Sequence, residues 1–290
     1  MNVNSLSPQQ RQQIVAWLTY LREIGGVDFY RGAEEQRGFE QETSTVHAGA
    51  PGQNTLTDAS TRVAPVSPEL LPTMPSKSIV LAAPPTIDFS TPGIPHDQRA
   101  AALLSIQTVI GDCTRCPLAF EGRNKIVFGD GDPNAELLFV GEGPGADEDM
   151  QGVPFVGRGG HLLNNMITAM GLRREQVYIA NIVKCRPPKN RVPEPIEALT
   201  CTPFLFQQIG IVRPKLIVAL GATAATYLTG SKAALSVLRG QIHDCMGTKL
   251  IVTYHPAYLL RDPRQKAEAW KDLQLAMRFL HLSPPKNSHN

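Results

Sequence analysis

Four short apolar runs recur along the C-terminal two thirds of the chain, and segments with helical periodicity separate them. The runs are rich in Val, Ile and Leu, have the length of buried strands, and cover residues 137–140, 177–183, 216–220 and 250–254. The helical segments cover residues 98–110, 158–171, 194–213, 222–230 and 264–280. Alternating strands and helices are typical of a parallel sheet with helices on both faces. We therefore expect an α/β fold, a three-layer α/β/α sandwich around a central four-stranded parallel sheet.

Two segments with a different pattern precede this domain. Residues 7–25 carry apolar side chains at helical spacing, which predicts a short N-terminal helix. This helix either packs on the main domain or docks a partner, and the sequence does not choose between the two. A segment with nine prolines from residue 51 onward and no sustained apolar period follows, which is typical of a disordered linker. The expected helical segment, linker, folded domain and disordered tail cover residues 1–31, 32–96, 97–283 and 284–290.

Polar or glycine-rich motifs follow the predicted strands. The first strand leads into Gly-Glu-Gly-Pro-Gly at 141–145, and Asn181 lies near the end of the second strand. Gly221 follows the third strand, and His255-Pro-Ala at 255–257 follows the fourth. Ligands of open α/β sheets bind outside the carboxyl ends of the strands. These motifs therefore predict a ligand site at that end of the sheet.

Five cysteines supply a second candidate for chemistry. Cys113 and Cys116 form a Cys-x-x-Cys pair, and Cys185 and Cys201 have fifteen residues between them. Four thiolates suit zinc or an iron–sulfur cluster, and the first pair alone also suits a redox dithiol. The spacing leaves these alternatives open. Cys245 has no nearby partner in the sequence and is interpreted as an ordinary thiol.

Charge and composition narrow the class of protein. Residues 1–95 hold 6 Lys and Arg against 9 Asp and Glu, whereas residues 96–290 hold 22 against 17, so the predicted domain is mildly basic. A basic domain permits a polyanionic partner. No secretory signal is recognisable, and no stretch approaches the roughly 20 apolar residues of a membrane span. We expect a cytoplasmic protein without membrane contact, whose clustered cysteines stay reduced.

The motifs together carry a resemblance to a known family. They are Cys-Thr-Arg-Cys-Pro-Leu at 113–118, Gly-Glu-Gly-Pro-Gly at 141–145, Glu-Asp at 148–149, Gly-Val-Pro-Phe-Val-Gly at 152–157, Asn-Ile-Val-Lys-Cys-Arg-Pro-Pro at 181–188, Asn-Arg-Val-Pro at 190–193, His-Pro-Ala at 255–257 and Leu-Leu-Arg at 259–261. Over residues 110–280 the chain resembles the family 4 uracil-DNA glycosylases, the iron–sulfur class of that superfamily. The resemblance implies an enzyme that hydrolyses the bond between uracil and deoxyribose in single- or double-stranded DNA, acting as a monomer. It also implies a [4Fe–4S] cluster on Cys113, Cys116, Cys185 and Cys201.

The resemblance assigns the base-binding residues. Asn181 is similar to the amide that accepts from uracil N3–H and donates to O4, which cytosine would mismatch. Phe155 is similar to the aromatic residue that stacks on the base. Glu148 occupies the position that crowds the C5 face of the base and would exclude the thymine methyl group.

The same resemblance assigns the catalytic residues. His255 is the expected donor to uracil O2, with backbone N–H groups of the loop at Glu142 and Gly143 as further donors. Glu142 is the expected carboxylate for the attacking water. A related branch bonds covalently to uracil through a histidine in a basic loop. The sequence has no histidine between Lys184 and Pro195, so we expect ordinary turnover.

DNA contacts are expected from two segments. The first is basic and comprises Lys184, Arg186, Lys189 and Arg191, for which phosphates are plausible targets. The second comprises Leu259, Leu260 and Arg261. Its two leucines either fill the gap left by the extruded base or simply begin a buried segment.

Two other classes of protein compete with this interpretation. A glycine-rich loop after a strand is superficially like the phosphate loop of a dinucleotide-binding protein, but the acidic residues at 147–149 would repel phosphate. A non-enzymatic iron–sulfur protein would explain the cysteines, but it would leave Asn181, Phe155 and His255 without a role.

Overall fold

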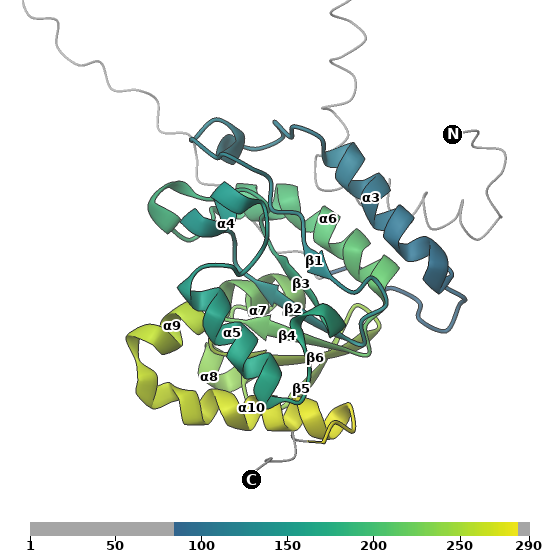
Figure 1. The fold of residues 1–290 in the computed structure, drawn as a ribbon, viewed down its shortest axis with the longest axis vertical. Coiled ribbons are helices and arrows are strands. Elements are labelled where there is room, and N and C mark those ends of the chain that lie inside the picture. Colours follow the sequence, from purple (N-terminus) through teal and green to yellow (C-terminus); the bar gives the residue numbers. More distant parts are fainter. Residues whose placement is uncertain (1–83, 284–290) are drawn as a thin grey trace, which may run out of the picture. The chain divides into compact units, whose positions relative to one another are not determined.

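The structure, a computed structural model, describes residues 84–283, and a six-stranded sheet lies at its centre (Figure 1). The strands lie in the order β1-β3-β2-β4-β6-β5. Their bounds are β1 Asp130–Gly131, β2 Leu137–Gly141, β3 Tyr178–Asn181, β4 Leu216–Leu220, β5 Ile242–Cys245 and β6 Thr248–Thr253. The four inner strands pair in parallel, and β1 and β5 pair antiparallel at the two sides. The carboxyl ends of the four parallel strands therefore meet at one end of the sheet.

The four parallel strands are those that the apolar runs predict, and the two outer strands are additions. All residues of β2, β3 and β4 are buried, so these strands read as continuous apolar runs. In contrast, β1 has only two residues, and most of β5 is not buried, with Ile242 at 40% exposure. Neither outer strand has an apolar run that the sequence could reveal. The expected four-stranded sheet is corrected to six strands with a four-stranded parallel centre.

Helices cover both faces of the sheet. The longer ones are α3 Arg99–Ile110, α5 Arg158–Ala169, α6 Pro195–Val212, α7 Ala222–Thr229 and α10 Lys266–Phe279. The shorter ones are α4 Ala146–Gln151, α8 Leu235–Leu238 and α9 Pro256–Arg261, with 3-10 turns η3 His96–Gln98, η4 Pro117–Ala119, η5 Arg174–Gln176, η6 Pro188–Asn190 and η7 Pro263–Gln265. Each longer helix begins and ends within two residues of its predicted segment, whereas the three shorter helices were not predicted.

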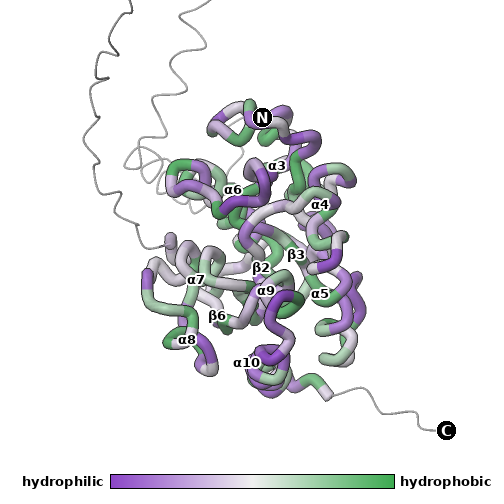
Figure 2. Tube along the Cα trace, turned by 90° about the vertical axis from the view of Figure 1, so that its left-hand side faces the viewer, coloured by the Kyte–Doolittle hydropathy of each residue, from purple (hydrophilic) through white to green (hydrophobic). Residues whose placement is uncertain are grey.

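The core has two layers because alternate side chains of each strand point to opposite faces. On β2, Leu138 and Val140 join the core formed with α3, α6 and α7. Leu137 and Phe139 join the core formed with α5, α9 and α10. Figure 1 shows α3 beside α6 and α5 beside α9, and Figure 2 shows hydrophobic positions gathered around β2 and β3. The three-layer α/β/α architecture is therefore confirmed.

Local sequence explains where the longest helix begins and ends. Pro195 occupies the first position of α6, where its fixed φ suits a helix and no N–H is needed. The side chain of Glu197 reaches back to accept the N–H of Glu194 at 2.7 Å. Arg213 ends the helix in the left-handed conformation, with φ of 49°.

The last residues of the segment interpreted as a linker, 84–96, lie against the folded domain. Phe89 and Ile87 pack on the core, and the N–H of Ile87 donates to the carbonyl of Met246 at 3.0 Å. The guanidinium of Arg213 lies 4.9 Å from the ring centroid of Phe89. Ordered packing therefore begins before residue 97.

Several expectations fall on residues that the structure does not describe. These are the N-terminal helix, most of the linker and the C-terminal tail, at 1–31, 32–83 and 284–290. Within residues 84–283, no helix combines the length and apolar character that crossing a membrane requires.

We predict that Phe89→Ala lowers the free energy of unfolding by about 1–2 kcal/mol, because a half-buried ring and its contact with Arg213 are lost. Chemical denaturation of the full chain measures this change. The matched control is Phe120→Ala, since Phe120 is 76% exposed and its loss should change the value by less than about 0.5 kcal/mol. Equal effects of the two substitutions would contradict a packing role for residues 84–96.

Candidate active site

The candidate site begins where β2 and β3 end together. Gly141 and Asn181 are register partners at the carboxyl ends of these parallel strands. A Cβ atom at Gly141 would lie 2.5 Å from Asn181 Oδ1 and 2.5 Å from Cζ of Phe155. The carboxamide of Asn181 and the ring of Phe155 therefore meet over the backbone of Gly141, in space that a side chain would fill.

His255 completes this group of three side chains. It directly precedes α9, and its ring centroid lies 5.6 Å from that of Phe155, with the planes inclined by 33°. Gly221 packs against His255. The φ of Gly221 is +91°, and a Cβ at this position would lie 3.0 Å from Cβ of His255. The sequence placed Asn181, Phe155 and His255 at one site, and the structure brings the three together.

The side-chain oxygen of Asn181 is buried and can accept a hydrogen bond. Its side chain is buried, with 1% exposure, and its Oδ1 has no hydrogen-bond partner among residues 84–283. A buried polar atom without a partner costs about 1–3 kcal/mol. A ligand N–H placed at this oxygen would remove that cost.

The tautomer and charge of His255 follow from its surroundings. Its Nδ1 accepts the N–H of Ala257 at 3.1 Å, so the proton of the neutral ring lies on Nε2. Burial lowers the pKa of His255 to about 4; the charge of Arg261 lowers it further and that of Glu148 opposes the shift. The ring is therefore a neutral Nε2–H donor near pH 7.

The loop after β2 holds Glu142 and Gly143 beside this group. The hydroxyl of Thr223, at the start of α7, donates to the carboxylate of Glu142. Gly143 packs closely on the next segment, since a Cβ there would lie 2.7 Å from Cγ2 of Val183. The glycine thus keeps the loop against the segment after β3, and the threonine fixes one oxygen of the carboxylate.

Glu148 binds backbone N–H groups with both of its carboxylate oxygens. Its Oε1 accepts from Val156 and Gly157, both at 2.9 Å, and its Oε2 accepts from Gly145 at 3.1 Å. These contacts connect the loop after β2 to the loop that carries Phe155. The structure therefore gives Glu148 a loop-holding contact that the sequence did not predict, and its role against the thymine methyl stays a prediction.

The prediction that Lys184 contacts phosphate is corrected. Its side chain is buried, with 1% exposure, and its Nζ donates to the carbonyl of Asn181 at 2.9 Å and to Oε1 of Gln208 at 2.6 Å. Burial lowers the pKa of the Lys184 ammonium to about 8, and the charge of Cys201 opposes this shift. Lys184 supports the strand end behind the pocket instead of reaching solvent.

The other basic residues of this segment differ in their partners. Arg191 donates to both oxygens of Glu197, at 2.8 and 2.7 Å, and to Glu121 at 3.0 Å. The bidentate pair gives Arg191 a structural contact with α6, and its contact with phosphate stays a prediction. Arg186 donates to Oδ1 of Asn190 at 2.8 Å, and Lys189 is exposed.

The structure also separates the residues of the second predicted DNA segment. Leu259 is 1% exposed and belongs to the core under α9, which favours the alternative of a buried segment for this residue. Leu260 is half-buried and Arg261 is exposed. Only the latter two remain available to a ligand.

The four predicted metal-binding cysteines line one small cavity. Two follow α3, one follows β3 and one lies in α6, and the full lining is Ile110, Cys113, Cys116, Ile126, Lys184, Cys185, Thr200, Cys201 and Phe204. No group of three or more His, Cys, Asp or Glu among residues 84–283 is arranged to hold a single metal ion. Four thiols around one cavity are a donor set that fits zinc or an iron–sulfur cluster.

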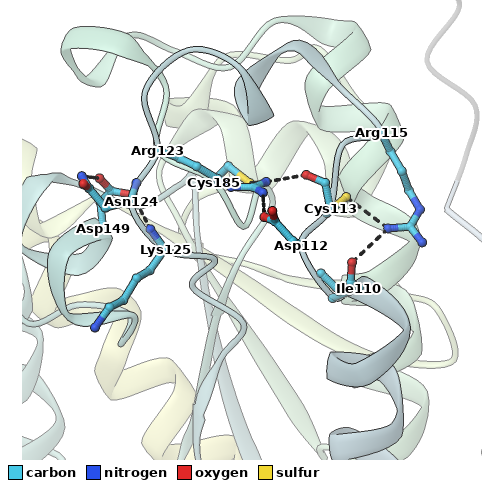
Figure 3. Close-up of polar contacts among 9 residues, drawn as sticks. All are labelled: Ile110, Asp112, Cys113, Arg115, Arg123, Asn124, Lys125, Asp149 and Cys185. Carbon is cyan, nitrogen blue, oxygen red and sulfur yellow. Dashed lines mark hydrogen bonds and ion pairs between the residues drawn. The ribbon is translucent and has the colours of Figure 1, made fainter.

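Hydrogen bonds to sulfur support this fit. Cys113 Sγ accepts from Arg115 at 3.2 Å, Cys185 Sγ accepts from Arg123 at 3.3 Å, and Cys201 Sγ accepts the backbone N–H of Lys184 at 3.2 Å. Figure 3 shows Arg123 and Arg115 on either side of Cys113 and Cys185. Such N–H donors stabilise the negative charge of thiolate ligands.

Burial opposes these hydrogen bonds, because it disfavours the charged thiolate and raises the pKa of the thiols. It raises the pKa of Cys116 to about 11 and that of Cys201 to about 12. Metal binding to these thiols would therefore release protons.

The cysteine cavity is joined to the pocket loops through Arg123 and its neighbours. Arg123 also donates to the carbonyl of Cys113 and pairs with Asp112. The next residue, Asn124, donates through its backbone and side chain to Asp149, at 2.9 and 2.6 Å (Figure 3). Asp149 is fully buried in α4, the helix that carries Glu148.

The sequence interpretation missed the long-range contacts of Thr223, of Arg123 and of Arg174, the last of which donates to the carbonyl of Phe155 at 3.1 Å. Each acts through a contact with a residue distant in the chain, such as the 81 positions between Thr223 and Glu142. The sequence around Arg174, Arg-Arg-Glu-Gln at 173–176, reads only as a polar turn. No local pattern could have identified these three residues.

Comparison with known proteins defines the class. The family model of the Uracil DNA glycosylase superfamily matches residues 128–274, which include the ends of all four parallel strands. The type-4 uracil-DNA glycosylase of Thermotoga maritima is 45% identical over 172 residues, covering 58% of this chain and 89% of that relative. Those of Pyrobaculum aerophilum and Archaeoglobus fulgidus are 41% and 40% identical, covering 60% and 57% of this chain and 92% and 86% of the relatives.

The chain belongs to the type-4 uracil-DNA glycosylases. The resemblance found from the motifs is thereby confirmed. The alternatives of a dinucleotide-binding protein and of a non-enzymatic iron–sulfur protein are set aside.

We predict that His255 contributes equally to catalysis across the neutral range. Because its pKa is lowered to about 4, the ring stays neutral as the pH falls through the usual histidine value and protonates only near pH 4. The ratio of kcat/KM between the unmodified enzyme and His255→Gln should therefore be constant from about pH 5.5 to 8. A ratio that changes across about pH 6.5 would show an ordinary, titrating histidine.

Proposed function

We propose that this enzyme extrudes uracil from DNA into the pocket of Asn181, Phe155 and His255 and hydrolyses its N-glycosidic bond. The product is an abasic site, as in the first step of base excision repair. The observation that carries the proposal is the buried Oδ1 of Asn181, which has no hydrogen-bond partner among residues 84–283 and lies beside the ring of Phe155, which itself packs against the neutral imidazole of His255. This combination suits a flat, neutral base with an N–H on its edge.

Asn181 supplies selectivity for uracil. Its Oδ1 accepts N3–H and its Nδ2 donates to O4, so that both atoms of the carboxamide are used. Cytosine offers an acceptor at N3 and a donor at N4, which would leave buried polar groups opposed. A site that uses hydrogen bonds in this way rejects the wrong base strongly. Phe155 provides the surface on which the extruded base stacks.

His255 stabilises the leaving group. Negative charge develops on the departing base as the glycosidic bond breaks, mainly at O2. The Nε2–H of His255 donates to that oxygen, with backbone N–H groups at Glu142 and Gly143 as further donors. A neutral donor that is already oriented by Ala257 needs no rearrangement at this step.

Glu142 stabilises the sugar, which becomes positively charged as the base leaves. Its carboxylate, held by Thr223, offsets the positive charge that grows on deoxyribose and orients the attacking water. The water adds to C1′ of the sugar as the C1′–N1 bond breaks. The electron pair of that bond leaves with the base as an anion, and the proton of the water passes to the carboxylate of Glu142.

DNA is held by cations of the two predicted segments. Lys189 and Arg261, which are exposed, and Arg186 and Arg191, which are partly buried, are the candidates for phosphate contacts, and Leu260 is the candidate to fill the gap in the base stack. Affinity for DNA should fall as salt is added, because phosphate contacts release counterions.

The four cysteines would hold a [4Fe–4S] cluster. Bound there, the cluster would supply a structural joint between the segment after α3, the segment after β3 and α6, and no step of the reaction passes through it. The reducing cytoplasm, where these cysteines stay reduced, is the compartment that this proposal requires. We propose that the enzyme acts there as a monomer.

An oligonucleotide assay tests the proposed function. Duplexes and single strands with uracil, thymine or cytosine at one position are incubated with the enzyme, and abasic sites are revealed by alkaline cleavage. Cleavage at uracil alone is expected. Asn181→Leu, purified in parallel, should be inactive, which excludes a contaminating glycosylase. Unmodified enzyme without activity on any uracil strand would overturn the proposal.

We predict that Glu142→Gln keeps its affinity for uracil-containing DNA but loses turnover by about 10²-fold or more, because the amide carries no charge to offset the cationic sugar. Single-turnover rates and DNA binding measure the two effects separately. Glu136→Gln is the matched control, since Glu136 is exposed and pairs with Lys215 away from the pocket. Near-normal turnover of Glu142→Gln would remove Glu142 from the mechanism.

We also predict that Cys201→Ser loses iron and the broad absorption near ~400 nm, whereas Cys245→Ser keeps both. Cys245 is a buried thiol that donates to the carbonyl of Leu228 and does not line the cavity. Iron content of about four atoms per chain and the absorption spectrum are the measurements. One zinc atom in place of iron would contradict the cluster.

A further inference from the structure

Phe155 has an unusual backbone conformation for a residue with a side chain. Its φ is 52°, in the left-handed region, while its ring is buried, with 6% exposure. This conformation is unfavourable for a residue with a side chain and persists only where the surroundings enforce it. The position of the stacking ring therefore depends on what holds this backbone.

Arg174 holds the carbonyl groups of the loop. From η5, its guanidinium donates to the carbonyl of Pro154 at 2.6 Å and to the carbonyl of Phe155 at 3.1 Å. The same guanidinium donates to Oδ2 of Asp130 at 3.2 and 3.0 Å and to Oδ1 of Asn164 at 3.1 Å. Its side chain is only 18% exposed, so these contacts are shielded from water.

Glu148 holds the N–H groups of the same loop from the other side. Its Oε1 accepts the N–H groups of Val156 and Gly157, the two residues after Phe155. A cation therefore binds the carbonyls, an anion binds the amides, and Phe155 lies between them. Charge-assisted hydrogen bonds of this kind are roughly twice as strong as neutral ones.

Helix α5 closes the remaining side of the loop. A Cβ at Gly160 would lie 2.0 Å from the carbonyl oxygen of Phe155, so the loop lies directly on the helix backbone. Asn164, one turn further along α5, is the residue that Arg174 also contacts. The loop is thus fixed at its carbonyls, at its amides and against the helix.

We propose that Arg174 is a positioning residue for uracil excision, which keeps the ring of Phe155 in the stacking position by holding its backbone. The proposal rests on the proposed function, in which Phe155 stacks on the base. A planar fork of donors meets two successive carbonyls, a carboxylate and an amide at once, and a lysine ammonium cannot reproduce this arrangement. A displacement of about 1 Å at a positioning group can cost on the order of 10²-fold in rate.

The test compares Arg174→Met and Arg174→Lys with Arg173→Met, the neighbouring arginine, in the full chain. Both Arg174 variants should lower kcat/KM on a uracil-containing oligonucleotide by about 10- to 100-fold and raise the inhibition constant of free uracil, whereas Arg173→Met should match the unmodified enzyme. Full activity of Arg174→Lys would show that a positive charge alone suffices, which contradicts positioning by the planar guanidinium.

A double-mutant cycle separates positioning from general stability. If Arg174 acts through Phe155, adding Arg174→Met to Phe155→Ala should reduce activity by no more than about two- to threefold further. Losses that multiply in the double variant would overturn the proposal, because they would show an effect independent of the ring.

A second variant covers the case in which Arg174→Met does not fold. Asp130→Ala removes the carboxylate partner of Arg174 from β1, where Asp130 is 43% exposed. It should give a smaller loss that again disappears in the Phe155→Ala background. If the unmodified enzyme is active and every Arg174 and Asp130 variant is equally active, this inference is refuted and the proposed function stays intact. Inactive unmodified enzyme would refute the proposed function itself.

Discussion

The pocket depends on the close approach of two side chains over the backbone of Gly141. The carboxamide of Asn181 and the ring of Phe155 both lie 2.5 Å from where a Cβ at this position would be. Parallel pairing of β2 and β3 puts Asn181 level with Gly141, and the end of β6 then brings His255 to the ring. A missing side chain at one strand end therefore lets three strands contribute to one small site.

Burial then determines the chemistry of the pocket wall. His255 is kept neutral, and Asn181 presents an oxygen without a partner among the described residues. Two charged groups beside the wall bind backbone: Lys184 supports the carbonyl of Asn181, and Glu148 binds loop amides. Such a wall suits a neutral base that is selected by its hydrogen bonds, and the charged groups hold the backbone around the pocket in place.

Hydrogen bonds also connect the cysteine cavity to the pocket. Cys201 accepts the N–H of Lys184, whose ammonium supports Asn181, and Arg123 begins the connection to Asp149 and α4. A group bound by the four cysteines would thus stabilise both Asn181 and the helix that carries Glu148. The cluster that we propose would therefore act by stabilising the site and not by transferring electrons.

The sequence predicted the features that local pattern controls. Buried strands such as β4 and long helices such as α6 show in the apolar periodicity, and strand-end motifs identified Asn181 and His255. The short outer strands escaped because β1 has two residues and β5 is largely exposed. Lys184 was interpreted as a phosphate contact because a charged residue in a basic segment gives no sign that tertiary packing will bury it.

The position of free uracil in a crystal of this enzyme tests the central claim most directly. The account predicts one uracil stacked on Phe155, with N3 and O4 facing the carboxamide of Asn181 and O2 within hydrogen-bond distance of His255 Nε2. Uracil bound elsewhere, or bound in this pocket with its N3–H turned away from Asn181, would contradict the account.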